Sequence, residues 1–208
     1  MSASGRGRTP VPTRYPCAKV LEMTDDQGLD ITALGAQGDG IAVVDGARLY
    51  VPFALPGERV RRPEGEGLPD MVSAPSPDRV APACRHFGVC GGCAAQHMSD
   101  ALYAAWKRDQ VVAAFAQRGL EPDIAPLVRV APGTRRRAVL TAKVRDGRAL
   151  LGFHRQRSHD LVDVQECPVL LPAIVDKLPA LRALCAGLPQ GEARVTVLAT
   201  RAGLDVAI

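Results

Sequence analysis

The chain has 208 residues, of which 47% are hydrophobic and 4% aromatic, and its formal net charge is +4. This composition supports one or two globular domains and excludes a disordered chain. No run approaches the roughly 18 apolar residues of a membrane span, and the N-terminus lacks the apolar segment of a secretory signal, so we expect a cytoplasmic protein. Because 20 Gly and 17 Pro accompany few aromatic residues, we expect many turns and a β-rich α+β fold.

The first part of the chain predicts a basic arm and then a small barrel. Residues 1–24 are rich in Gly, Pro, Ser and Arg and are expected to form a flexible arm. Residues 25–80 contain short β-branched runs between glycines, and Asp45-Gly46 predicts a type I′ hairpin. We therefore expect an OB-like barrel. The glycines at 35, 38 and 40 precede a strand rather than a helix, which argues against a dinucleotide-binding loop.

Residues 81–128 carry a cysteine cluster. Cys84, Cys90 and Cys93 follow the spacing C-x5-C-x2-C, and Cys167 lies further on, directly before a proline. In a reducing compartment such a cluster indicates a metal site. The spacing fits an iron-sulfur cluster somewhat better than zinc, and both stay open. His86 and His97 could replace a thiolate but are expected to make local hydrogen bonds, and Cys17 and Cys185 are expected to be inert thiols.

Beyond the cluster, one long helix and a sheet are expected. Ser99 is a plausible N-cap for a helix that ends at Gly119, with Trp106 and Phe115 in the core. Residues 129–208 predict antiparallel strands, with a hairpin at Asp146-Gly147, a helix over 170–185 that breaks at a proline, and a closing hairpin. The last strand stops abruptly, so we expect this sheet to be incomplete and the chain to be part of a longer protein.

Positive charge is concentrated between residues 129 and 157. This segment holds nine Lys or Arg and one acid, so it carries +8 while the rest of the chain carries −4. A basic stripe on an acidic body is typical of a phosphate-binding surface, although a solvated arginine-rich face is the alternative. The residues expected to contact RNA are Arg135, Arg137, Lys143, Arg155 and Arg157.

Several stretches resemble one family. "ITALGAQGDGIAVVDGARLYVPFALPGERV" resembles a TRAM domain, a small RNA-binding barrel. "SPDRVAPACRHFGVCGGCAAQH" resembles the 4Fe-4S segment of bacterial RNA uracil-5-methyltransferases that act on 23S rRNA. "TRRRAVLTAKV", "LLGFHRQRSHDLVDVQECPVL" and "GLDVAI" resemble the central β-region of that family. The order and spacing of these stretches make the resemblance specific.

The resemblance implies a TRAM barrel at 25–80, a cluster loop and helix at 81–128, and a truncated central domain at 129–208. It implies that Cys84, Cys90, Cys93 and Cys167 hold a 4Fe-4S cluster, and that the full-length enzyme uses S-adenosylmethionine. The chain departs from the family at Thr134, where an aromatic residue is usual, and at Ala95-Gln96, where Leu-Gln is usual.

No Rossmann half, S-adenosylmethionine site, catalytic cysteine or catalytic base can be assigned in this chain. We therefore expect the RNA-recognition and cluster-bearing N-terminal part of a 23S rRNA uracil-5-methyltransferase, monomeric and inactive alone. The alternative is a non-enzymatic RNA-binding module with a structural zinc or iron-sulfur site.

Overall fold

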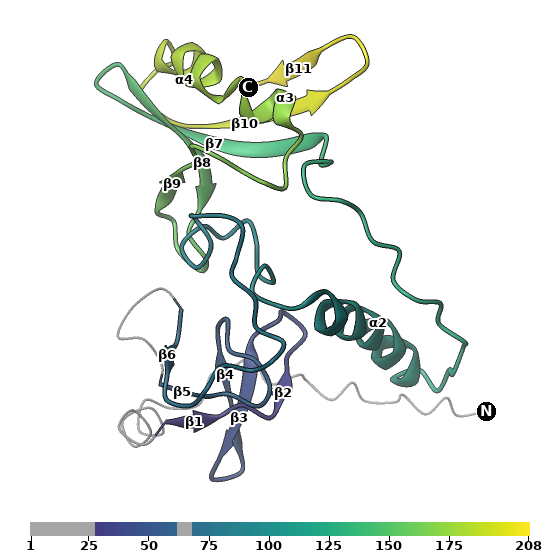
Figure 1. The fold of residues 1–208 in the computed structure, drawn as a ribbon. Helices are drawn as coiled ribbons and strands as arrows, with labels where there is room; N and C mark the ends of the chain where they lie inside the picture. The colour runs from purple at the N-terminus through teal and green to yellow at the C-terminus, as the bar shows by residue number, and fades with distance from the viewer. Residues whose placement is uncertain (1–27, 62–67) are drawn as a thin grey trace, which may run out of the picture.

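The computed structural model describes residues 28–61 and 68–208 (Figure 1). Short strands form one end of the molecule, a larger sheet forms the other, and an irregular loop that contains the cysteines runs between them. The elements are β1 (Leu29–Asp30), β2 (Ala33–Leu34), β3 (Gly40–Val44), β4 (Ala47–Val51), β5 (Arg59–Arg61), β6 (Asp70–Met71), α2 (Asp100–Ala116), β7 (Arg137–Arg145), β8 (Arg148–His154), β9 (Leu161–Asp163), α3 (Pro172–Val175), α4 (Leu178–Ala186), β10 (Gly191–Ala199) and β11 (Leu204–Ala207).

The strands of the N-terminal end form two three-stranded antiparallel sheets, in the orders β1-β5-β6 and β2-β3-β4. The predicted hairpin is confirmed, because Asp45 and Gly46 join β3 to β4 with φ values of 50° and 76°. Gly40 is needed for close packing, since a Cβ there would lie 2.8 Å from the carbonyl oxygen of Ala54. The shared core consists of Leu29, Ile31, Ala42, Leu49, Val51, Ala54 and Val60. Its assignment as an OB-like or TRAM barrel stays a prediction.

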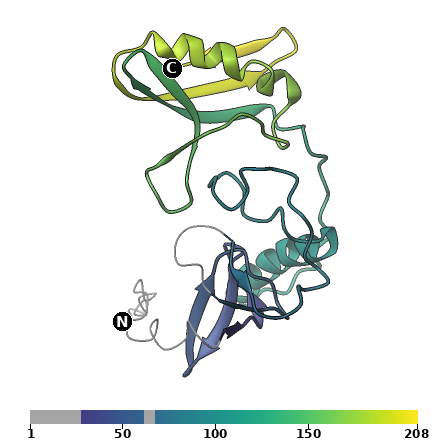
Figure 2. The same ribbon diagram turned by 60° about the vertical axis from the view of Figure 1, so that its left-hand side comes forward.

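The C-terminal end is one five-stranded antiparallel sheet, in the order β11-β10-β7-β8-β9. Its hairpin at Asp146-Gly147 has the predicted positive φ values of 50° and 70°, and β10 and β11 form the predicted closing hairpin. In β7, buried and more exposed residues alternate from Arg137 to Arg145, as expected for a sheet covered on one face. Figure 2 shows α3 and α4 on the covered face. The β-rich, antiparallel prediction for this region is confirmed.

The helices agree with the sequence except in two details. Ser99 caps α2, because its Oγ accepts a hydrogen bond of 3.1 Å from the backbone N–H of Leu102. Trp106 is buried as predicted, whereas the prediction for Phe115 is wrong, because this residue is 37% exposed. The C-terminal half of α2 extends away from the strands, so no core is available there (Figure 1).

The helical segment after Cys167 divides into α3 and α4, as predicted, but the break falls at Asp176-Lys177. Pro179 lies in the first turn of α4, where its missing N–H costs no hydrogen bond. Within the described ranges, no helix combines the length and apolar character that a membrane span requires.

Side chains of α2 and of the segment after β8 contact the N-terminal end. The indole Nε1–H of Trp106 donates a 2.9 Å hydrogen bond to the carbonyl oxygen of Gly35. Beyond β8, a guanidinium N–H of Arg157 donates a 2.6 Å hydrogen bond to the Asp39 carboxylate, which is buried. These contacts join segments that are far apart in the chain.

Candidate metal centre and nucleic-acid interface

Four cysteines surround one cavity. Cys84, Cys90 and Cys93 belong to the loop between β6 and α2, and Cys167 belongs to the segment between β9 and α3. All four line the same cavity, together with His86, Phe87, Gly92, Gln96, Arg135, Phe153, Val164, Glu166, Val169 and Leu170. The fold therefore brings the remote Cys167 to the other three thiols. Their role as metal ligands stays a prediction.

The loop is anchored at the end of β8 through Cys90 and Gly91. Cys90 forms an isolated antiparallel bridge with Arg155, and the N–H of Gly91 donates a 2.9 Å hydrogen bond to the carbonyl oxygen of His154. A Cβ at position 91 would lie 2.8 Å from that oxygen, so the close approach requires glycine. The N–H of Gly92 donates to Cys90 Sγ over 3.4 Å. This backbone arrangement turns the loop toward the cavity.

The loop is also joined to the segment that carries Cys167. The Arg85 guanidinium pairs with Glu166 Oε2 at 2.8 Å, and the Arg85 backbone N–H donates to Glu166 Oε1 at 3.3 Å. The hydrogen bond from the Arg85 side chain lowers the pKa of Glu166, with the backbone hydrogen bond acting in the same direction. The backbone N–H of Gln165 donates to His86 Nε2 over 3.4 Å. His86 therefore makes a local hydrogen bond, as predicted.

The electrostatics of the cavity suit a cation. Burial raises the pKa of the Cys84 thiol, and the nearby sulfurs of Cys167 and Cys93 raise it further. The pKa of Cys90 is also raised, chiefly by burial and then by the other three cysteines. Negative charge on one sulfur thus disfavours ionisation of the other thiols. A positively charged metal would offset both the cost of burying a thiolate and the repulsion between thiolates.

Within residues 28–61 and 68–208, no three or more His, Cys, Asp or Glu side chains lie in an arrangement that could hold a metal ion. Four thiols supply the donor set that zinc and iron-sulfur clusters use. Gln96 lines the cavity, and its buried Nε2 has no hydrogen-bond partner among the described residues. A group at the centre of the cavity would explain this unpartnered donor.

The other sulfurs and the second histidine have different surroundings. Cys185 is fully buried in the apolar core beneath the five-stranded sheet, and Cys17 lies outside the described residues. His97 is fully buried beside the rings of Phe53 and Phe87, and neither of its ring nitrogens has a hydrogen-bond partner among the described residues. The prediction of a local hydrogen bond is therefore wrong for His97. Burial lowers its pKa to about 4, so the ring is neutral at pH 7.

The basic residues singled out from the sequence divide into several groups. Arg137 and Lys143 lie on the face of the sheet opposite the helices, and Lys143 Nζ is 3.4 Å from Glu192 Oε1. Arg135 forms a parallel bridge with Leu170 and lines the cysteine cavity. Arg157 pairs with the buried Asp39. The structure thus brings Arg135 and Arg155 to the edge of the cysteine loop.

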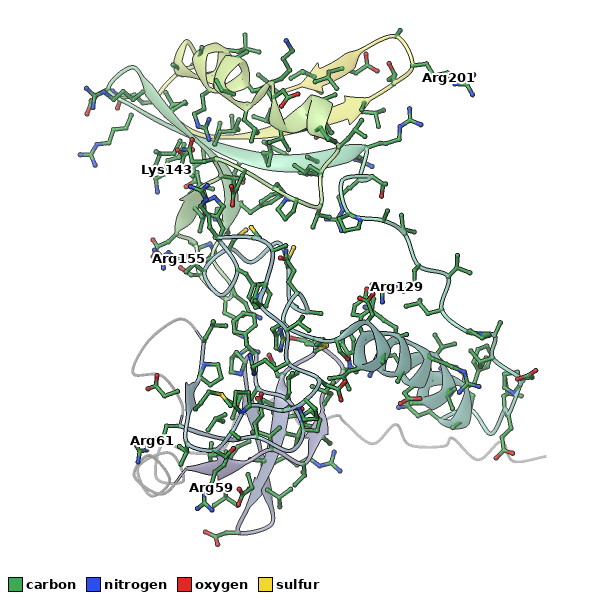
Figure 3. All side chains as sticks on the ribbon, in the orientation of Figure 1. Arg59, Arg61, Arg129, Lys143, Arg155 and Arg201 are labelled. Carbon is green, nitrogen blue, oxygen red and sulfur yellow. The ribbon has the colours of Figure 1, made fainter. Side chains whose placement is uncertain are left out.

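Figure 3 shows where some of these cations lie. The labelled Lys143, Arg155, Arg61 and Arg59 lie along the same side of the molecule in this view, from the large sheet down to the N-terminal strands. By contrast, the Arg136 side chain is bonded within the protein: its Nε donates a 3.0 Å hydrogen bond to the carbonyl oxygen of Ala199. Positive side chains therefore extend beyond the predicted hairpin, and Arg59 and Arg61 were not expected from the sequence.

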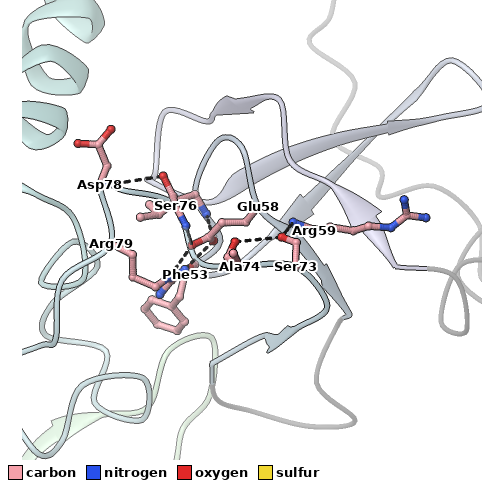
Figure 4. Close-up of polar contacts among 9 residues, drawn as sticks. Phe53, Glu58, Arg59, Ser73, Ala74, Ser76, Asp78 and Arg79 are labelled. Carbon is pink, nitrogen blue, oxygen red and sulfur yellow. Dashed lines mark hydrogen bonds and ion pairs between the residues drawn. The ribbon is translucent and has the colours of Figure 1, made fainter.

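A buried ion pair at the entrance to the cysteine loop was also missed. Glu58 is 1% exposed, and its carboxylate accepts hydrogen bonds from the backbone N–H groups of Leu55 and Ser76 and from the Arg79 guanidinium (Figure 4). Arg79 also donates to the carbonyl oxygen of Phe53 at 2.7 Å. Burial alone would raise the pKa of Glu58, but the hydrogen bonds outweigh it and lower the pKa. The sequence offered no pattern that pairs residues 58 and 79.

Comparison with known proteins identifies relatives over most of the chain. An uncharacterized RNA methyltransferase of Brucella suis biovar 1 is 44% identical over 86% of this chain and 44% of its own length. An uncharacterized RNA methyltransferase of Caulobacter vibrioides is 46% identical over 88% of this chain and 46% of its own length. The 23S rRNA (uracil(1939)-C(5))-methyltransferase RlmD of Bordetella pertussis is 42% identical over 77% of this chain and 37% of its own length. No family model matches the chain.

A solved structure shares the fold. The tRNA (uracil-54, C5)-methyltransferase of Pyrococcus abyssi, in complex with S-adenosyl-L-homocysteine, is similar with a TM-score of 0.51 and 23% identity, over 86% of this chain and 44% of that one. The chain spans less than half the length of the relatives named here. It is a homologue of the RNA methyltransferases, a family that includes enzymes named for methylating 23S rRNA at uracil C5.

Proposed function

We propose that this chain is the RNA-recognition and cluster-bearing N-terminal part of an S-adenosylmethionine-dependent 23S rRNA uracil-5-methyltransferase of the cytoplasm, and that it does not methylate RNA alone. The observation that carries the proposal is the cavity lined by four cysteines, within a chain that is 42–46% identical to RNA methyltransferases. In this proposal residues 25–80 form a TRAM barrel, 81–128 the cluster loop and helix, and 129–208 the central domain.

Cys84, Cys90, Cys93 and Cys167 would hold a 4Fe-4S cluster. When bound, such a cluster supplies a rigid connection between four thiolates, and it can also carry an electron, which methyl transfer does not need. Contacts within the chain already bring the two cysteine-bearing segments together. Arg85 and Glu166 hold the two cysteine-bearing segments together, and Gly91 holds the loop against β8. The cluster would thereby fix residue 84 beside residue 167.

The RNA would lie along the basic side of the molecule, on Arg135, Arg137, Lys143, Arg155 and Arg157. Support comes from the open face of the sheet, where Arg137 has no acidic partner among the described residues, and from Lys143, whose ion pair with Glu192 is half exposed and therefore weak. Arg157 already contacts Asp39, so an RNA phosphate would have to share its guanidinium. Substrate binding and orientation are the steps that these residues can perform.

Metal analysis tests the cluster directly. Protein purified without oxygen should be brown and contain about four iron and four sulfide per chain, because four thiolates suit a cubane cluster. A colourless protein with one zinc per chain would instead support the non-enzymatic RNA-binding module with a structural metal. Incubation with S-adenosylmethionine and 23S rRNA fragments should give RNA binding without methyl transfer, and methylated uracil would contradict the assignment of this chain as inactive alone.

A further inference from the structure

The side-chain amide of Gln96 is oriented by one cysteine of the cavity. Gln96 Oε1 accepts a 3.2 Å hydrogen bond from the backbone N–H of Cys84. Because that N–H can only donate, the atom facing it must be the amide oxygen, and this fixes which way the amide points. The amide nitrogen, Nε2, therefore points away from the Cys84 backbone.

That nitrogen has no partner. Gln96 Nε2 is buried and has no hydrogen-bond partner among the described residues. A buried, unpaired amide donor costs about 1–3 kcal/mol, so such groups normally have an acceptor in the functional protein. Gln96 lines the cavity of the four cysteines, and an acceptor bound there would complete its hydrogen bonds.

We propose that Gln96 is a positioning residue for the cluster: its Nε2–H donates a hydrogen bond to a sulfur of the group that the four cysteines hold, while its Oε1 holds the Cys84 backbone. This inference rests on the proposed iron-sulfur cluster. Hydrogen bonds to cluster sulfurs stabilise the reduced, more negative state and raise the reduction potential. The reduction potential therefore reports on that hydrogen bond, and the protein needs no electron-transfer step.

Another glutamine offers a matched control. Gln165 lies two residues before Cys167, but its Nε2 already donates a 2.6 Å hydrogen bond to Asp163 Oδ2. Replacing either glutamine with methionine removes the same amide at similar side-chain length. Only the replacement at position 96 should remove a donor from the cluster.

The experiment compares anaerobically purified wild-type, Gln96→Met and Gln165→Met proteins by iron content and by the midpoint potential of the cluster. The inference expects a more negative potential in Gln96→Met, an unchanged potential in Gln165→Met, and weaker H2O-to-D2O shifts of the Fe–S Raman bands in Gln96→Met alone. An unchanged potential and unchanged band shifts in Gln96→Met would overturn it. If Gln96→Met loses its iron, Gln96→Glu decides at a pH where its carboxyl is ionised, because a carboxylate still accepts from Cys84 but cannot donate. Wild-type H2O-to-D2O band shifts in that variant would overturn the inference; its potential is no guide, because the added charge lowers the potential by itself.

The metal content of the wild-type protein distinguishes failure of the proposed function from failure of the role of Gln96. If the wild-type protein contains zinc or no metal, the cluster itself is wrong and no variant needs to be compared. If the wild type contains the cluster and the Gln96 variants match its H2O-to-D2O band shifts, the cluster stands and only the role of Gln96 fails.

Discussion

Three consecutive arginines allow RNA binding to be separated from a merely solvated basic face. Arg137 points to the open face of the sheet, whereas the Arg136 side chain donates to the carbonyl oxygen of Ala199. Arg135 precedes β7, forms a bridge with Leu170 and lines the cysteine cavity, where a bound RNA could reach it. We therefore expect Arg135→Ala and Arg137→Ala to weaken RNA binding more than Arg136→Ala.

The size of the effect follows from counterion release. Each lost phosphate contact should reduce the slope of log affinity against log salt by about 0.7–0.9. Over a fourfold change in salt, from about 50 to 200 mM, the affinity ratio of wild type to variant should therefore shrink by about threefold. Affinities for looped or single-stranded rRNA fragments, measured at both salt concentrations for the three variants, provide the assay.

Two controls accompany these measurements. Iron content must be followed in Arg135→Ala, because Arg135 lines the cysteine cavity and its loss could act through the cluster. Thermal unfolding must be followed in Arg136→Ala, which loses a hydrogen bond to Ala199. If the salt slope is unchanged in both Arg135→Ala and Arg137→Ala, the basic hairpin does not contact RNA and the proposed interface is wrong.

Two further predictions concern the cavity and its support. Cys167→Ser should lose the cluster, because it removes the ligand that spans to the second segment, whereas Cys185→Ala and Cys17→Ser should keep their iron; equal iron in all three, measured by metal analysis, would refute the ligand assignment. Glu58→Ala should lower the free energy of unfolding by about 3–5 kcal/mol, because it leaves the Arg79 charge and two backbone N–H groups unpaired. The pKa of Glu58 is lowered in the folded protein, so this stabilisation is present above about pH 4.5 and is lost as the pH falls further; denaturant titrations of wild type and variant should therefore converge in acid, and a pH-independent difference would contradict the assignment.

Local sequence signals predicted the elements well. The two Asp-Gly pairs require positive φ at both positions, which only a few turn types supply, so each hairpin could be placed to the residue. Ser99 could be recognised as a cap because its hydroxyl replaces a missing backbone partner at the start of a helix. The prediction for Phe115 failed because helical periodicity shows which face is apolar but not whether another element covers it.

The surroundings of the site could not be predicted in the same way. The four cysteines were found from spacing and from the resemblance, but their supporting contacts join residues far apart in the chain, such as Arg157 with Asp39 and Arg79 with Glu58. No local pattern specifies such pairs. The same holds for Gln96: the sequence shows a polar residue near the cysteines, and only the structure shows that one end of its amide is held while the other has no partner.

The supporting contacts indicate what a bound cluster would add. The cysteine loop is held to the large sheet by Gly91, and residue 79 at its start is held to the N-terminal strands by the buried carboxylate of Glu58. A group bound to all four thiols would add a connection between this loop and the segment of Cys167, and binding energy at such a site stabilises the arrangement it requires. Because Arg135 and Arg155 lie beside this loop, and Arg59 and Arg61 lie on the strands at its other end, the cluster would fix the spacing between two sets of positive charges. An RNA that contacts both sets would then bind a prearranged surface, and less conformational entropy would be lost on binding.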